Sequence, residues 1–440
     1  MNILFLEMEH QNLQFMKKLV ESGHNVYTNQ YDSPNYLKSF GITALEEIPY
    51  MIWATDLVDI KDYEKYHNNL PEIIYDRFEQ VLEKYKIDLV INTYPIANEM
   101  IHSKDWGVDI VTCSPEAVKL ETEKMFANKF ARHCGIKCPN ILQTGNDNHN
   151  INAEKLPDEY VIKPMIDWVS STMMRKEYHD KVKELYGGFS KSYYLEEVIK
   201  GLETNISYIM SDGEWAFTFS EHCDESKAKQ VWNVNPQVWY ANTTIEELEP
   251  DIDKKVRDNV VEYLNQTAKL GGTYEGSITQ MLGEDGELYF LENNCRPYVN
   301  NTFPIPYTGD EYLDAFRNNP KKIGDWFEGR KFPKIVLQSP KIGKEDEKCV
   351  YPFHLHTKYN IAEPTPIEII DDKYIATRGG VVVVFEDEIN MDFIEEVEKE
   401  SELRAYFGNW DIESYKYNSI NKKFLIQGTN KWGDNYVFMG

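Results

Sequence analysis

The first quarter of the chain alternates short apolar runs with stretches of helical periodicity. Residues 3–6 (ILFL) form a continuous apolar run, which is typical of a strand buried on both faces. Apolar residues three to four positions apart predict a helix over residues 13–20, and Gly23 marks its end. The pattern predicts further strands at residues 26–27, 87–92 and 108–113. Strands that alternate with helices indicate a doubly wound, Rossmann-like parallel sheet that ends near residue 113.

A different organisation follows this sheet. Ser114, Pro115 and Glu116 predict the start of a helix, because a hydroxyl caps free N–H groups, proline fits the first turn and an acid suits the positive end of the helix dipole. The helical pattern continues to Gly135, with a break near Thr122.

From residue 160 onward, strand and turn signals dominate. Residues 211–214 (SDGE) and 284–287 (EDGE) each separate two apolar runs, so each predicts a hairpin turn. A last unit includes the strand-like run 381–385 followed by an acidic helix. We therefore expect a mixed α/β and α+β chain of three domains, at residues 1–113, 114–335 and 336–440.

Composition limits the classes of function. The formal net charge is −26, which argues against a nucleic-acid binder because phosphate backbones attract Lys and Arg. No apolar run approaches the roughly 18 residues of a membrane span, and Glu7 interrupts the opening apolar run, which argues against a signal peptide. The six cysteines form no C-x-x-C pair, so free core thiols are expected in place of zinc or disulfides. The expected location is the cytoplasm.

The first candidate for chemistry is the segment 160–173 (YVIKPMIDWVSSTM). A strand presents Lys163, and a short loop then offers Ser170, Ser171 and Thr172 in a row. Successive N–H groups and hydroxyls can surround polyphosphate oxygens, and the lysine adds a positive charge. An ordinary Ser-rich loop is the alternative.

A second candidate is the segment 193–203 (YYLEEVIKGLE), where a half-buried strand ends in two carboxylates. The connector after Glu196 can present backbone groups to a purine edge, and Glu203 can hold ribose hydroxyls. The alternative is a charged strand end exposed to solvent.

The third candidate is the segment 288–297 (LYFLENNCRP). Glu292, Asn294 and Arg296 lie on one face of the predicted strand, because side chains on a strand repeat every two residues. A carboxylate and an amide oxygen on one face suit Mg²⁺, and the planar fork of an arginine suits a phosphoryl group.

The order of these segments resembles that of the ATP-grasp superfamily: a helix with a lysine (TEKMFANKF, 122–130), a strand with a lysine and a Ser-rich loop, a Glu-Glu hinge, then Glu-Asn-Asn-x-Arg. Within it the chain is most similar to phosphoribosylamine–glycine ligase over nearly its full length, including SPEAVKLETEKMFANKFARHCGIKCP at 114–139. The resemblance implies an ATP-grasp fold between a Rossmann-like N-terminal domain and a small C-terminal α+β domain, in a monomer or homodimer.

The resemblance also implies roles for individual residues. For ATP they are Lys124 and Lys163 at the phosphates, Ser170, Ser171 and Thr172 in the phosphate lid, Glu196, Glu197 and Val198 at the adenine, and Glu203 at the ribose. For Mg²⁺ (or Mn²⁺) they are Glu292, Asn294 and Gln280. The catalytic residues would be Lys163 and Arg296.

The second metal acid of the superfamily falls here on or next to Gln280. Three alternatives stay open: Gln280 serves as a neutral ligand, Glu275 reaches in from farther upstream, or metal binding is weakened.

The substrate half departs from the resembled ligase. Residues 7–11 (EMEHQ) keep its Glu-His pair but lose the glycines of its opening loop, and Val-Ser-Ser-Thr at 169–172 replaces its glycine-rich lid. The segments 220–236 and 297–301 differ as well, so a substrate other than phosphoribosylamine is expected. The residues expected to line the acceptor site are Glu9, His10, Glu221, His222, Trp239, Tyr298 and Asn300. A core or interface role for the tryptophans is the alternative.

These features predict an ATP-dependent ligase that activates a small carboxylate as an acyl phosphate and transfers it to an amine. Three other functions stay open: a diverged glycinamide ribonucleotide synthetase, a nucleotide-binding module without catalysis, and a kinase of the same fold. The joint presence of Lys124, Lys163, Glu292, Asn294 and Arg296 argues against the module without catalysis.

Overall fold

The structure is a computed structural model of the 440-residue chain. It describes residues 1–7, 12–29, 34–48, 77–146, 153–164, 172–175, 192–223, 245–296, 306–332, 334–338, 348–359, 367–376, 380–385, 388–405, 411–418, 423–429 and 435–439.

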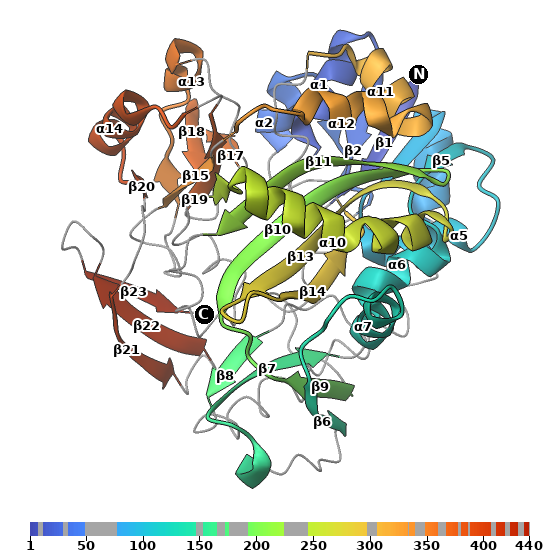
Figure 1. Ribbon diagram of the computed structural model, residues 1–440. Helices are drawn as coiled ribbons and strands as arrows, with labels where there is room; N and C mark the ends of the chain where they lie inside the picture. Colours follow the sequence, from blue (N-terminus) through green and yellow to red (C-terminus); the bar gives the residue numbers. More distant parts are fainter. Residues whose placement is uncertain are drawn as a thin grey trace.

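The N-terminal part contains a five-stranded parallel sheet (Figure 1). Its strands stand in the order β3 (Ile42–Ala44), β2 (Asn25–Thr28), β1 (Asn2–Leu6), β4 (Leu89–Asn92) and β5 (Asp109–Val111). The order reverses between β1 and β4, which makes this the switch point of the sheet. The parallel sheet expected from the alternating pattern is confirmed.

Helices pack on both faces of this sheet and bury its middle strand, β1. Ile3 and Phe5 pack into one hydrophobic cluster, which includes α1 (Leu13–Glu21) and α2 (Pro34–Ser39). Leu4 and Leu6 pack into another, which includes the helical residues 77–85 and α5 (Asn98–His102). The unbroken apolar run of β1 follows from burial on both sides.

Two short helices lead out of the N-terminal sheet. They are α6 (Pro115–Thr122) and α7 (Lys124–His133), with the expected break between them. The Ser114 hydroxyl accepts a hydrogen bond of 3.0 Å from the N–H of Ala117, which confirms the predicted cap. After α7 the chain turns at Gly135, whose φ of 82° favours glycine.

The largest sheet has eight strands and is antiparallel in every pairing. Its main path runs β14 (Leu288–Asn294), β13 (Thr273–Gly283), β10 (Gly201–Ser211), β11 (Glu214–Cys223), β12 (Ile245–Glu247), β15 (Lys334–Gln338) and β19 (Gly380–Val384), and β20 (Arg404–Ala405) pairs with β15. Both predicted hairpins are present, as β10–β11 and β13–β14. Since β15 contains residue 335, the sheet continues across the expected domain boundary.

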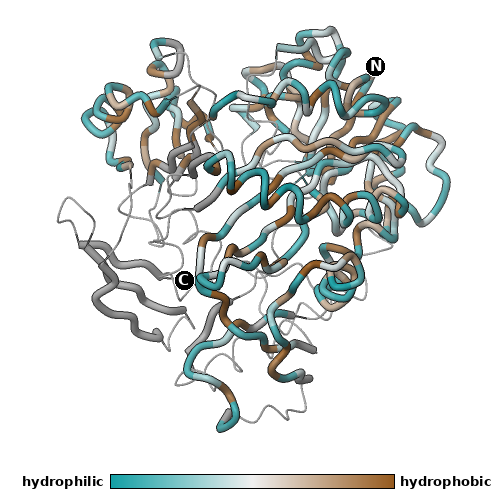
Figure 2. The backbone as a smooth tube through the Cα atoms, in the orientation of Figure 1, coloured by the Kyte–Doolittle hydropathy of each residue, from teal (hydrophilic) through white to brown (hydrophobic). Residues whose placement is uncertain are grey.

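A long helix, α10 (Pro250–Ala268), covers one face of this sheet (Figures 1 and 2). Its residues Val256, Val260 and Leu264 recur every four positions and pack against Ile206 and Ile278 of the sheet. The sequence interpretation did not include this helix, although its apolar spacing is present in the chain.

A smaller antiparallel sheet lies next to the large one (Figure 1). Its strands stand in the order β6 (Ile141–Asn146), β9 (Ser192–Glu196), β7 (Glu159–Pro164) and β8 (Thr172–Arg175). It carries Lys163 on β7 and Glu196 at the end of β9, as the sequence predicts.

The remaining elements include two further three-stranded sheets. In chain order, these elements are η1 (Pro95–Ala97), η2 (Ala153–Lys155), α11 (Gly309–Asn318), α12 (Pro320–Phe327), β16 (Cys349–Val350), α13 (His354–Tyr359), β17 (Ile367–Ile370), β18 (Lys373–Ala376), α14 (Met391–Glu400), β21 (Asp411–Asn418), β22 (Lys423–Thr429) and β23 (Asn435–Met439). The two sheets have the strand orders β16-β18-β17 and β21-β22-β23. The ring of Tyr312 in α11 makes an edge-to-face contact with that of Phe15 in α1, with the centroids 4.6 Å apart, which joins α11 to the helix layer of the N-terminal sheet. In the described part of the chain, every helix is too short or too polar to cross a membrane.

Candidate active site

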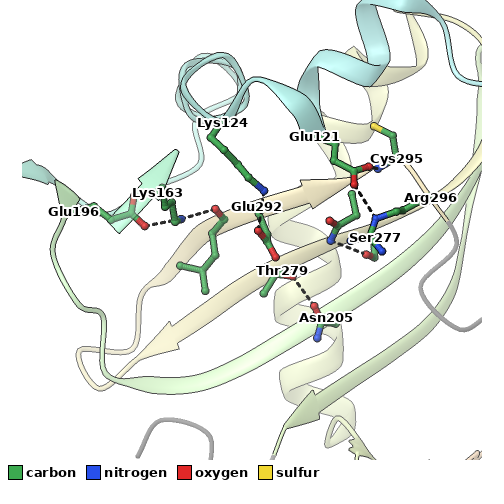
Figure 3. A network of polar contacts seen from close by, with 12 residues as sticks. Glu121, Lys124, Lys163, Glu196, Asn205, Ser277, Thr279, Glu292, Cys295 and Arg296 are labelled. Atoms are coloured by element: carbon green, nitrogen blue, oxygen red, sulfur yellow. Dashed lines mark hydrogen bonds and ion pairs between the residues drawn. The ribbon is translucent and has the colours of Figure 1, made fainter. Parts of the chain in front are cut away.

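One row of polar side chains crosses four strands of the large sheet. Glu292 of β14 stands opposite Thr279 of β13, which stands opposite Asn205 of β10, which stands opposite Glu221 of β11. Directly opposed residues of antiparallel strands share a face, so the four side chains lie on one side of the sheet. The Thr279 hydroxyl donates a hydrogen bond of 2.6 Å to Oδ1 of Asn205 (Figure 3).

Asn294 extends this polar face. It stands opposite Ser277, and its Nδ2 donates a hydrogen bond of 3.3 Å to the serine hydroxyl. The residue between, Asn293, points to the other side, where its Oδ1 accepts a hydrogen bond of 2.9 Å from the buried Tyr208 hydroxyl. The face shared by Glu292 and Asn294 is therefore the one opposite α10, and their predicted alignment is confirmed.

Lys124 reaches this face from the first residue of α7. Its Nζ lies 3.1 Å from Oε2 of Glu292. Burial alone raises the pKa of Glu292, but Lys124, Lys163 and Arg296 together hold it below its ordinary value. Glu292 is therefore a carboxylate at neutral pH, as a ligand of a divalent cation must be.

Lys163 joins the smaller sheet to the larger one. Its Nζ lies 2.5 Å from Oε1 of Glu196 and donates a hydrogen bond of 2.8 Å to the carbonyl of Leu291. The register of β13 and β14 shifts between Thr279 and Gln280, which leaves Leu291 as the extra residue of a β-bulge. The bulge thus supplies the carbonyl that holds Lys163.

Glu196 is buried beside this lysine. Burial raises its pKa above the ordinary value, and the Lys163 ammonium offsets this only in part. Its second oxygen, Oε2, has no hydrogen-bond partner among the described residues. The next carboxylate, that of Glu197, accepts hydrogen bonds of 2.9 Å from the backbone and side-chain nitrogens of Asn140.

Arg296 follows the end of β14 and is held by an acid that the sequence interpretation missed. Its Nε lies 2.7 Å from Oε1 of Glu121, and the N–H of Cys295 donates a hydrogen bond of 2.7 Å to Oε2 of the same residue. Figure 3 shows Glu121 coming from α6 toward both donors. The one signal in the sequence is an acid on the buried side of α6, next to Leu120.

The prediction that Gln280 is a metal ligand is wrong. Its side chain is buried on the α10 side, where Nε2 donates a hydrogen bond of 3.0 Å to the carbonyl of Val256 and Oε1 accepts one of 2.5 Å from Asn259. The bulge at Leu291 shifts the pairing by one position, so Thr279 stands opposite Glu292 where Ile278 would otherwise stand, and Gln280 lies on the other face of β13.

Glu275 does not complete the site either. Its carboxylate accepts a hydrogen bond of 2.9 Å from the Tyr312 hydroxyl, under α11. It lies on the polar face, but four residues from Thr279, or roughly 13 Å along an extended strand. Neither Gln280 nor Glu275 lies beside Glu292, which leaves weakened metal binding as the remaining alternative.

The other predicted residues fall into three groups. Glu203 lies on the same face of β10 as Asn205, and Val198 lies in the connector between β9 and β10. Thr172 is the first residue of β8 and His222 lies on β11; the structure describes only the backbone at these two positions. The residues that lie outside the described part altogether are Glu9, His10, Ser170, Ser171, Trp239, Tyr298 and Asn300.

The donor atoms on this face fit Mg²⁺ better than a transition metal. Within the described part, no three His, Cys, Asp or Glu side chains gather as a metal-binding group. The oxygens of Glu292, Asn294 and Thr279 form a hard donor set with one carboxylate. Mg²⁺ accepts such a partial set because it keeps waters and phosphate oxygens in its shell.

Comparison with solved structures identifies the fold. An L-amino acid ligase from Bacillus licheniformis matches with a TM-score of 0.59 at 12% sequence identity, over 93% of this chain and 99% of that one. A phosphoribosylamine–glycine ligase from Thermotoga maritima matches with a TM-score of 0.57 at 13% identity, over 92% and 99%. A biotin carboxylase from Campylobacter jejuni matches with a TM-score of 0.54 at 12% identity, over 92% of each chain. No protein-family model matches the sequence, and no curated protein matches it.

The chain therefore has the fold of the ATP-grasp ligases, with a parallel sheet followed by antiparallel sheets. The predicted fold class is confirmed. The similar structures include both the ligase that the sequence most resembles and ligases of other substrates.

Proposed function

We propose that the protein is an ATP-dependent carboxylate–amine ligase, which forms an amide through an acyl phosphate and releases ADP and phosphate. One observation carries the proposal: Lys124 of α7, Lys163 of β7, and Glu292 and Arg296 of the β14 segment come from three separate parts of the chain and meet at one polar face. The fold supports it, because the similar structures are named as ligases or carboxylases.

In this proposal the two lysines hold the phosphates of ATP. Lys124 and Lys163 are buried and fixed by Glu292, Glu196 and the Leu291 carbonyl, so their charges are in place before ATP binds. Charges that need no reorganisation stabilise a transition state most effectively. The adenine would contact Glu196 and the connector 197–200, and the ribose would contact Glu203.

Glu292 and Asn294 would hold Mg²⁺ at the end of the phosphate chain, with Thr279 beside them. The bound ion would neutralise charge on the phosphate oxygens. Glu292 is suited to this because neighbouring cations keep its pKa low.

The reaction then needs two transfers. An oxygen of the substrate carboxylate attacks the γ-phosphorus, and the bond from phosphorus to the ADP oxygen breaks. The amine next attacks the acyl carbon, phosphate leaves with the bonding electrons, and the amine loses a proton. Arg296 would stabilise negative charge on the transferring group, as an arginine fork can.

We further propose that the carboxylate and amine do not include phosphoribosylamine. Glu7 is fully buried directly after β1, at the switch point where parallel sheets bind ligands. Its carboxylate accepts hydrogen bonds of 2.9 Å from the backbone and side-chain nitrogens of Asn12 and one of 3.2 Å from Thr28. A buried carboxylate repels a phosphate group at this position, where the resembled ligase has glycines.

The test is an ADP-release screen of amino acids and other small carboxylates against amines. Wild type should release ADP with at least one pair, and Glu292→Ala should reduce the rate about a hundredfold or more. Glu287→Ala is the matched control, because Glu287 directly precedes the same strand, β14, and pairs with Lys137 at the surface. Equal rates in Glu292→Ala and wild type would overturn the mechanism.

Other outcomes would favour the alternatives. ADP release only with phosphoribosylamine and glycine would show a diverged glycinamide ribonucleotide synthetase. A phosphorylated product without an amine would show a kinase. Tight ATP binding without ADP release for any pair would show a module without catalysis.

A further inference from the structure

A buried acid on α6 has no place in the roles considered so far. Glu121 is 3% exposed and lies on the side of α6 that also buries Ala117 and Leu120. A buried carboxylate is costly unless hydrogen bonds replace the lost water. The hydrogen-bond donors to the Glu121 carboxylate therefore indicate the role of this residue.

Both oxygens of Glu121 are occupied by consecutive residues after β14. Oε2 accepts from the N–H of Cys295 and Oε1 from Nε of Arg296, each over 2.7 Å. The first contact fixes the backbone just before the arginine, and the second fixes the arginine side chain near its guanidinium. Together they restrain Arg296 at two points.

The same two segments form a second ion pair of reversed polarity. The segment at the α6–α7 break supplies Glu121 to Arg296 and Lys124 to Glu292. Glu121 and Lys124, three residues apart on this segment, thus pair with Arg296 and Glu292 respectively. This pairing fixes where the metal-binding oxygen and the arginine lie relative to each other.

The two partners differ in exposure. The side chain of Arg296 is 24% exposed, whereas that of Glu121 is 3% exposed. A purely structural ion pair gains nothing from leaving the cation open on the polar face. Arg296 also lies close enough to Glu292 to lower its pKa.

We propose that Glu121 is a positioning residue, which holds the Arg296 guanidinium in the orientation used for phosphoryl transfer. The inference rests on the proposed function for the step in which Arg296 acts. A cation held in place before the substrate binds costs no reorganisation at the moment of reaction.

The first test is Glu121→Gln. The amide keeps the size of the side chain, but it places an N–H₂ group against one of two N–H donors and removes the charge. We expect kcat for ADP release to fall roughly tenfold to a hundredfold, with the KM for ATP changed by less than about twofold because Arg296 acts on the transferring group. Glu116→Gln is the matched control, since Glu116 is on the exposed side of the same helix and pairs only with Lys119 among the described residues.

A double-variant comparison separates positioning from structural support. In the Arg296→Lys background the Nε donor is gone, so Glu121→Gln should lower kcat by less than about twofold further. Full multiplication of the two losses would overturn the proposal, because Glu121 would then act independently of Arg296. Where Glu121→Gln fails to fold, Glu121→Asp serves in its place; it keeps the charge and should retain more activity than any uncharged variant.

The last measurement does not depend on catalysis. With ¹⁵N-labelled arginine, the Nε–H signal identified by its loss in Arg296→Lys should exchange slowly in wild type and rapidly in Glu121→Gln. Unchanged exchange would overturn the positioning role even if ADP release fell. Absence of ADP release in wild type with slow exchange intact would instead overturn the proposed function.

Discussion

The Nζ atom of Lys124 lies 3.1 Å from Oε2 of Glu292, 168 positions farther along the chain. Lys124 is 5% exposed and Glu292 is 26% exposed, so this pair is largely shielded from water. It fastens the start of α7 to the polar face of the large sheet. In the proposed function Lys124 neutralises the carboxylate that would bind Mg²⁺.

The pH dependence of stability should reveal this pair. The pKa of Glu292 lies below its ordinary value of 4.5 in the folded protein, so the paired carboxylate stabilises the fold above pH 4.5. This contribution is lost as the pH falls through the lower folded pKa. Lys124→Met should therefore reduce the free energy of unfolding by about 3 kcal/mol at neutral pH, and the difference from wild type should shrink on acidification.

Urea unfolding at a series of pH values measures this effect. Lys129→Met is the control, because Lys129 lies on the exposed side of the same helix. A difference between Lys124→Met and wild type that stays constant from neutral pH to well below 4.5 would contradict the assignment.

The proposed Mg²⁺ donor set of Glu292, Asn294 and Thr279 contains one carboxylate, which leads to a second prediction. Thr279 stands directly opposite Glu292, at the position where an acid would complete the donor set. Thr279→Glu should lower the Mg²⁺ concentration needed for half-maximal ATP binding by about tenfold, because a second carboxylate adds charge to the site. Without metal the variant should lose about 1 kcal/mol of stability, because like charges would face each other across the strands.

Gln280→Glu is the informative comparison. This position is one residue further along the strand but faces α10, where Gln280 bonds Val256 and Asn259. The new charge would be buried away from the metal face, so it should destabilise the protein without changing the Mg²⁺ requirement. A lower requirement in Gln280→Glu but not in Thr279→Glu would show that the face has been assigned the wrong way round.

The sequence predicted several residues that the structure brings together at the polar face. Lys163, Glu292 and Asn294 were recognisable because a strand places alternate residues on one face and because the order of segments resembles ATP-grasp chains. The Gln280 prediction is wrong because a spacing counted back from Glu292 does not reveal the bulge at Leu291, which puts Thr279 and not Gln280 on the face of Glu292.

Other parts of the site depend on contacts between distant segments. Glu121 meets Arg296 across 175 positions, and Asn205 meets Thr279 across 74, so local periodicity carries no signal for either contact. Helix α10 is a different case, because the helical spacing of Val256, Val260 and Leu264 is a local signal in the sequence.

The buried pair of Lys163 and Glu196 gives a third prediction. Lys163→Met leaves a buried carboxylate without its cation and also removes a hydrogen bond to Leu291. The free energy of unfolding should fall by about 3–5 kcal/mol. Lys163→Met combined with Glu196→Leu should recover part of this loss, because the uncompensated charge is then absent.

The control for this pair is Lys200→Met. Lys200 and Glu159 form an exposed ion pair of 3.7 Å near the same strands, and such a pair contributes no more than about 1 kcal/mol. Urea unfolding of all four proteins gives the comparison. Equal losses for Lys163→Met and Lys200→Met would show that Lys163 is not held as the structure describes.

The last prediction concerns the backbone beneath the metal face. Gly276 of β13 lies so close to its neighbours that an added Cβ would meet the ring of Tyr208 and would stand 2.7 Å from the carbonyl oxygen of Asn294. Tyr208 cannot easily yield, because it is buried and its hydroxyl donates to Asn293. An alanine at position 276 would therefore displace the backbone of β14, the strand that carries Glu292 and Asn294.

Gly276→Ala should accordingly lower the free energy of unfolding by about 1–3 kcal/mol and should also raise the Mg²⁺ requirement for ATP binding. Gly286→Asn is the control on the same hairpin: its site has open space, and asparagine tolerates the φ of 79° there. Thermal unfolding and Mg²⁺ titration of both variants decide the matter. If Gly276→Ala lost stability with an unchanged Mg²⁺ requirement, the tight contact would support only the core and would not position the metal face.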